Sequence, residues 1–70
     1  MEDARSLHLR IVGLRVSISL LEREEQGCRS LISSPLTTPE EKERAKVILE
    51  KVKQELLTDT IELARLEQGI

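Results

Sequence analysis

The chain has 70 residues, a net charge of −2 and no Phe, Tyr or Trp. A chain of this size buries only about 60% of the surface that its unfolded form exposes, so a single core gives marginal stability, and the aromatic side chains that dominate many small cores are absent. One Cys and one His exclude an internal disulfide and are too few for a structural zinc site, which leaves self-association as the remaining source of stability.

The same composition bounds the location of the protein and its class of partner. Polar residues interrupt the apolar stretch from Leu7 to Leu21, so no run is long enough to span a membrane. The acidic start Met1-Glu2-Asp3 is unlike the basic start of a signal peptide. We therefore expect a cytoplasmic protein without membrane contact, whose charge gives no general attraction to nucleic acid.

Residues 4–32 are predicted to form the first helix. Apart from Glu25, the residues on one side recur alternately four and three positions apart and are apolar, as in a helix packed along its length. A strand is the alternative over residues 7–20, where apolar and polar residues also alternate. We favour the helix, because a strand would need a bulge where the alternation changes face. The predicted apolar stripe consists of Leu7, Ile11, Leu14, Ile18, Leu21, Cys28 and Ile32.

The strongest helix signal covers residues 39–68. Thr38 can cap the first turn, Pro39 suits the first helical position, and Glu41 completes a capping box. Gly69 follows the last periodic residue, where we expect a left-handed C-terminal cap. The same alternation of four and three positions recurs, with Asp59 as its polar member. The stripe consists of Ala45, Leu49, Val52, Leu56, Asp59, Leu63, Leu66 and Ile70.

The two stripes predict an antiparallel hairpin. Residues 33–38 are rich in Ser, Pro and Thr and supply a turn of suitable length. Opposite charges then lie side by side, and pairs such as Arg10 with Glu62 select the antiparallel register more than they stabilise it. The aligned pairs are Leu7–Leu66, Ile11–Leu63, Leu14–Asp59, Ile18–Leu56, Leu21–Val52, Glu25–Leu49 and Cys28–Ala45.

Two carboxylates occupy positions in these stripes. A buried carboxylate needs a partner or a place at the rim, so we expect Glu25 and Asp59 to be partly exposed. Asp59 is predicted to lie near Arg15, and Glu25 near Lys46 or Lys53. A second interpretation is that the two carboxylates fix the register of the helices, as isolated polar core residues do in some coiled coils.

Further apolar residues lie on the side of the first helix opposite its stripe, and others lie in the distal half of the second helix. A large exposed apolar patch usually marks an interface. Glycine inside a helix is less favourable than alanine by up to ~1 kcal/mol, and Gly13 would let another helix approach closely. The predicted interface consists of Leu9, Val12, Gly13, Val16, Leu20, Leu57, Ile61 and Ala64.

The predicted fold class is therefore all-α, an antiparallel two-helix hairpin that dimerises into a four-helix bundle or binds a partner helix. We expect a non-enzymatic protein–protein interaction module, such as an adaptor, a regulator or a co-chaperone-like subunit. No cofactor, metal ion or small-molecule substrate is expected. His8 falls outside both apolar groups and is interpreted as a solvated surface residue, and Cys28 falls in the core stripe and is interpreted as a small buried apolar residue.

Nucleic-acid binding is the alternative function. Residues 15–20, RVSISL, resemble the N-terminal strand of ribbon-helix-helix DNA-binding proteins. The resemblance implies that Arg15, Ser17 and Ser19 lie on a paired strand in the major groove of DNA. The segment that follows is too short for the first helix of that family. RNA binding by a dimer of hairpins, similar to plasmid copy-number regulators, is the other form of this alternative, although Arg5, Arg10 and Arg15 point in three different directions around the first helix.

Overall fold

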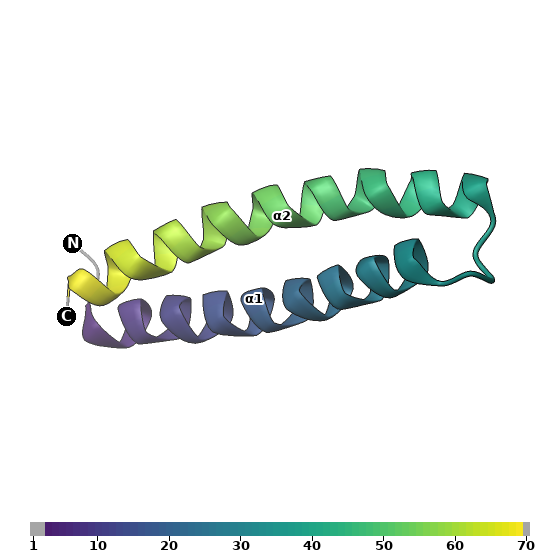
Figure 1. The fold of residues 1–70 in the computed structure, drawn as a ribbon. Helices are drawn as coiled ribbons and strands as arrows, with labels where there is room; N and C mark the ends of the chain where they lie inside the picture. The colour runs from purple at the N-terminus through teal and green to yellow at the C-terminus, as the bar shows by residue number, and fades with distance from the viewer. Residues whose placement is uncertain (1–2, 70) are drawn as a thin grey trace.

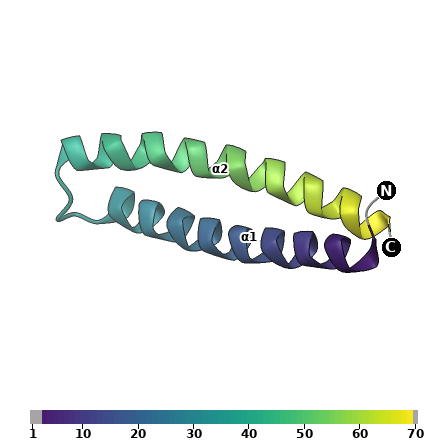
Figure 2. The same cartoon turned by 180° about the vertical axis from the view of Figure 1, so that it is seen from behind.

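The computed structural model describes residues 3–69, which form two antiparallel α-helices joined by a turn (Figure 1). Helix α1 covers Ala4–Ser33 and helix α2 covers Pro39–Gln68. The bounds of α2 are the expected ones, and α1 ends one residue later than expected. Seen from behind, the helices again lie side by side along their length (Figure 2). The predicted all-α hairpin is confirmed.

The strand alternative for residues 7–20 is wrong, because all of these residues lie within α1. A strand must place its backbone hydrogen bonds on a neighbouring strand, whereas a helix satisfies them within its own segment. The only other long segment of this chain is itself helical. The described residues therefore offer no strand with which residues 7–20 could pair.

Helix α1 begins at a carboxylate cap. The Ser6 amide donates to Asp3 Oδ1 at 2.7 Å, and the Leu7 amide donates to the Asp3 carbonyl at 3.1 Å. Because its carboxylate accepts the Ser6 amide hydrogen, the pKa of Asp3 is lowered from its ordinary value. These bonds satisfy amides that have no partner inside the helix.

The predicted Thr38 cap of α2 is confirmed, although the Glu41 carboxylate accepts the Thr38 hydroxyl and not, as in a capping box, the Thr38 amide. The Glu41 amide donates to Thr38 Oγ1 at 3.2 Å, the Thr38 hydroxyl donates to Glu41 Oε1 at 2.9 Å, and Pro39 occupies the first turn. The predicted left-handed cap at Gly69 is wrong, since its φ of −80° and ψ of 0° are right-handed. Its amide donates to the Leu66 carbonyl at 3.1 Å, so the helix ends by tightening its last turn.

The turn covers residues 34–38, and Ser34 organises it. The Leu36 amide donates to Ser34 Oγ at 3.2 Å, and the Thr37 amide donates to the Ser34 carbonyl at 3.4 Å. These bonds hold the backbone in a tight reversal, as serine hydroxyls do in many turns. Leu36 lies at the tip and is 92% exposed.

The core is a single seam between the helices. The fold measures 51 × 14 × 13 Å along its principal axes, so it is only one pair of helices thick. Every predicted stripe residue is buried or half-buried, so burial follows the two stripes, except that Ile70 lies outside the residues that the structure describes. Both members of the aligned pairs Leu21–Val52 and Cys28–Ala45 are buried. The buried apolar residues are Ile11, Leu21, Cys28, Ala45 and Val52.

Candidate interaction surface

All of the residues predicted to form an interface are exposed in the hairpin. Leu9 is 61% exposed, Val16 55% and Leu57 63%. Side chains of this size gain about 25 cal/mol for each Å² of apolar surface that a partner removes from water. The hairpin by itself leaves that free energy unused.

The apolar residues on α1 form a strip that faces away from α2. Leu9 and Val16 each lie two positions from a residue of the seam, which at about 100° per residue turns them about 200° away from it. We call Leu9, Val12, Gly13, Val16 and Leu20 the α1 outer strip. All five are exposed, and they cover the half of α1 that is distant from the turn (Figure 1).

The apolar residues on α2 form a second and shorter strip, Leu57, Ile61 and Ala64, which we call the α2 outer strip. Ile61 lies two positions from Asp59 and two from Leu63, which are both half-buried in the seam. The α2 outer strip therefore faces away from α1. One hairpin does not bring the two predicted groups together, because they lie on its opposite edges.

Gly13 has no structural role within the hairpin. A Cβ atom placed there would meet nothing within 4 Å, and the same is true of Gly27. Its φ is not positive, so the backbone conformation does not require glycine either. A contact that would favour glycine at this position must therefore come from outside the hairpin.

Four further apolar side chains are exposed that sequence reasoning did not select. Val47 is 58% exposed and Ile48 49%. They belong to no repeating apolar stripe, and single apolar residues on a surface are common. The available signal was the adjacent β-branched pair Val47 and Ile48, which begins two positions after Ala45. The missed residues are Leu31, Leu36, Val47 and Ile48.

Polar contacts across the seam lie at its edges. Arg10 Nη2 lies 3.3 Å from Glu62 Oε1, so this predicted ion pair is confirmed. Arg15 does not pair with Asp59 as predicted, because its Nη2 lies 2.6 Å from Glu67 Oε2. A long arginine side chain can reach a carboxylate that is well along the facing helix. The pairing of Arg15 is a correction to the prediction.

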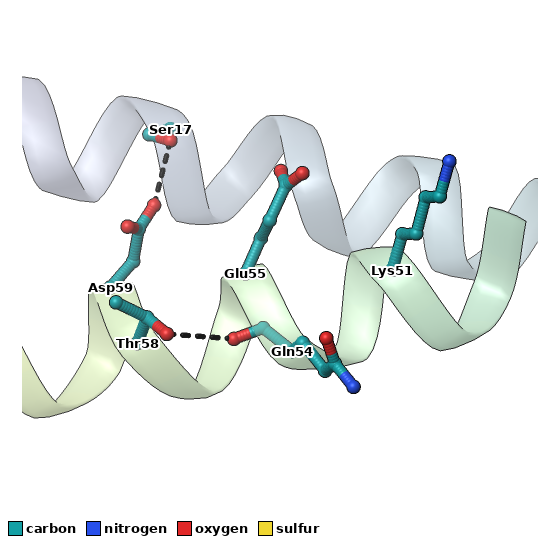
Figure 3. Close-up of a pocket in the computed structure, with 6 residues that line it drawn as sticks. All are labelled: Ser17, Lys51, Gln54, Glu55, Thr58 and Asp59. Carbon is teal, nitrogen blue, oxygen red and sulfur yellow. Dashed lines mark hydrogen bonds between the residues drawn. The ribbon is translucent and has the colours of Figure 1, made fainter.

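Asp59 and Glu25 are both half-buried, as expected for carboxylates at the edge of the seam. The Ser17 hydroxyl donates to Asp59 Oδ2 at 2.9 Å (Figure 3). Glu25 bonds to Arg29 of its own helix, with Nη2 to Oε2 at 2.8 Å, and not to Lys46 or Lys53 as predicted. Arg29 lies one turn along α1, where it is within reach in any arrangement of the two helices.

An open depression lies beside the Ser17–Asp59 hydrogen bond (Figure 3). Its lining is polar, and the Thr58 hydroxyl is used within its own helix, where it donates to the Gln54 carbonyl at 3.0 Å. No histidine or cysteine lines the depression, so the side chains there do not pair a nucleophile with an imidazole base. The lining residues are Ser17, Lys51, Gln54, Glu55, Thr58 and Asp59.

The remaining chemistry-bearing residues are dispersed. His8 is exposed and Cys28 is buried. Among residues 3–69, no group of three His, Cys, Asp or Glu side chains is placed to hold a metal ion. Neither helix, over the residues that the structure describes, is long and apolar enough to cross a membrane.

Comparisons with protein families, with curated proteins and with solved structures found no match to this chain. Of the two outer strips, the one on α1 is the longer.

Proposed function

We propose that this chain is a small non-enzymatic protein–protein interaction module that acts through the α1 outer strip. Its first partner is a second copy of itself, and the resulting homodimer is an assembly of four helices in which the two α1 helices pack against each other at the two-fold axis. The observation that carries the proposal is the row of exposed apolar side chains on the face of α1 opposite its seam, from Leu9 to Leu20.

The size of the fold supports the same proposal. A two-helix hairpin has one seam, and among residues 3–69 it buries five apolar residues. Domains of fewer than about 70–80 residues usually need a further source of stability beside their core. Covering the α1 outer strip with another helix would supply a second seam of similar chemistry, so association and stability have a common cause.

Nucleic-acid binding receives less support from the contacts. Arg10 and Arg15 lie beside Glu62 and Glu67, and a phosphate would have to compete with these carboxylates for the two guanidinium groups. Phosphate binding depends on clustered cations that are free to make contacts. We therefore retain protein binding as the proposed function.

The test is a charge placed in the middle of the α1 outer strip. Val16→Glu should dissociate the assembly and lower its helicity, because a carboxylate would have to be buried without a partner. Val47→Glu is the matched control, since Val47 is 58% exposed against 55% for Val16 and lies on the other helix near the turn. Sedimentation equilibrium on the wild-type chain and both variants gives the masses.

The expected result is a dimer for the wild-type chain and for Val47→Glu, and a monomer for Val16→Glu. A wild-type chain that is monomeric at its highest soluble concentration would overturn the proposed self-association. An unchanged dimer mass for Val16→Glu would show that the α1 outer strip is not the interface.

A further inference from the structure

Six positions on the outer side of α1 have a spacing that is the same when counted from either end. Successive members are four, four, three, four and four residues apart, and at about 100° per residue they stay within an arc of about 100°. The outermost members carry opposite charges, the next two are leucines, and the central two are a glycine and a valine. The pattern consists of Arg5, Leu9, Gly13, Val16, Leu20 and Glu24.

We infer that the α1 outer strip is covered by α1 of a second copy of this chain, packed antiparallel about a two-fold axis that passes between residues 14 and 15. This inference rests on the proposed function and specifies its partner and register. Arg5 then lies opposite the partner's Glu24, Leu9 opposite the partner's Leu20, and Gly13 opposite the partner's Val16. A two-fold axis repeats each contact, so the six positions form a complete self-complementary surface.

The charges decide between the two possible directions of the partner helix. In the antiparallel arrangement each Arg5 faces a carboxylate, whereas a parallel arrangement would place Arg5 against Arg5 and Glu24 against Glu24. Like charges across an interface oppose association. Both residues are exposed, and none of the ion pairs between residues 3 and 69 uses either of them.

Gly13 is explained by the same arrangement. It lies next to the axis, where the two α1 helices come closest, and a Cβ atom there meets nothing in the hairpin. A residue without a side chain lets the partner's Val16 approach the backbone of α1. The helix propensity that glycine loses relative to alanine, up to ~1 kcal/mol, is then offset by closer packing.

The α2 outer strip does not have these properties. Its outward face continues toward the turn with Glu50 and Gln54, and Gln68 follows it at the other end, so the apolar surface is shorter. No pair of opposite charges brackets Leu57 and Ala64 symmetrically. In the inferred dimer the two α1 helices lie in the centre and the α2 outer strips remain on the outside.

Reversal of the two charges tests the register. Arg5→Glu and Glu24→Arg should each weaken the dimer about tenfold in Kd, because each places like charges at both ends of the interface. The double variant should return Kd to within about threefold of wild type, and an equimolar mixture of the two single variants should form heterodimers in preference to homodimers. Lys51→Glu and Glu50→Arg change the net charge equally at exposed positions of α2 and should leave Kd unchanged.

Cysteine cross-linking gives an independent reading of the register. In a Cys28→Ala background, Leu9→Cys and Leu20→Cys chains should form a disulfide-linked dimer when they are mixed under oxidising conditions. Neither variant should cross-link alone, because the two copies of either position would be about 16 Å apart along the axis, well beyond the separation that a disulfide spans. Sodium dodecyl sulfate electrophoresis without reductant distinguishes these results.

The outcomes separate this inference from the proposed function. Additive losses in the double charge variant, or cross-linking of the Leu9→Cys chain with itself, would overturn the antiparallel register while the chain still dimerises through α1. A dimer mass that Val16→Glu does not change would instead overturn the use of this face altogether.

Discussion

Asp59 is the residue that interrupts the apolar seam of α2, and the structure gives its carboxylate one neutral partner, the Ser17 hydroxyl. A hydrogen bond of this kind contributes roughly 1 kcal/mol or less once the competing bonds to water are counted. An apolar side chain at this half-buried position would remove more apolar surface from water than the Asp59 side chain does. The seam is therefore expected to be less stable than its geometry allows.

Asp59→Leu should raise the free energy of unfolding by about 1 kcal/mol, because part of a leucine side chain would be buried against α1. Thermal unfolding followed by circular dichroism, at one fixed concentration, measures the change. Ser17→Ala is the control that removes only the hydrogen bond, and its effect should be smaller. A lower melting temperature for Asp59→Leu would contradict this account and would favour the hypothesis that the carboxylate fixes the register of the helices.

For the two helices, the structure could be predicted from the sequence wherever it depends on interactions between residues that are close in the chain. The cap of α2 uses Thr38, Pro39 and Glu41, which are adjacent in the chain, and the seam follows the periodicity of each helix. Gly69 was predicted wrongly because its left-handed and right-handed conformations differ by little free energy. An amide bond to Leu66 satisfies the helix end without the left-handed form.

The partners of long side chains were the least predictable feature of the candidate surface. Arg15 reaches Glu67 and Glu25 bonds to Arg29, although the alignment of the stripes suggested other pairs. Exposed ion pairs are worth only ~1 kcal/mol or less, so several partners within reach have nearly the same free energy. The identity of the exposed faces was predictable, because it follows from the same periodicity as the seam.

Gly13 and Gly27 of α1 both have space for a Cβ atom, so they allow a matched test of the helix contact inferred at Gly13. Gly13→Ala and Gly27→Ala should each increase helicity in a Val16→Glu background, where association is absent, since alanine favours a helix by up to ~1 kcal/mol and neither Cβ meets an obstacle. In the otherwise wild-type chain, Gly13→Ala should weaken the dimer and Gly27→Ala should not, because only Gly13 lies between the two inferred leucine contacts. Sedimentation equilibrium gives Kd for both variants, and equal values would count against a close approach at Gly13.

The whole molecule is a long, thin object, 51 Å in length and 14 Å across, and its shape limits what a monomer can bury. Every residue of the seam remains near the surface, because each helix has one neighbour. The ordering of the backbone costs about 1–2 kcal/mol for each residue, which one short row of buried side chains hardly offsets. Folding and association are therefore expected to be linked.

This linkage predicts that the melting temperature rises with protein concentration. Mass action stabilises a folded dimer relative to unfolded monomers. Each tenfold increase in concentration raises the free energy of unfolding by about 1.4 kcal/mol per mole of dimer. Circular dichroism melts over a hundredfold range of concentration should shift upward for the wild-type chain and for Val47→Glu. The melts of Val16→Glu should be lower and independent of concentration, because that variant has lost its second seam. A wild-type melting temperature that does not change over the same range, in a chain that sediments as a dimer throughout, would mean that unfolding is not coupled to dissociation, and would contradict the linkage. A constant melting temperature in a monomeric chain would mean that the single seam is enough to keep the hairpin folded, and would contradict the expected linkage.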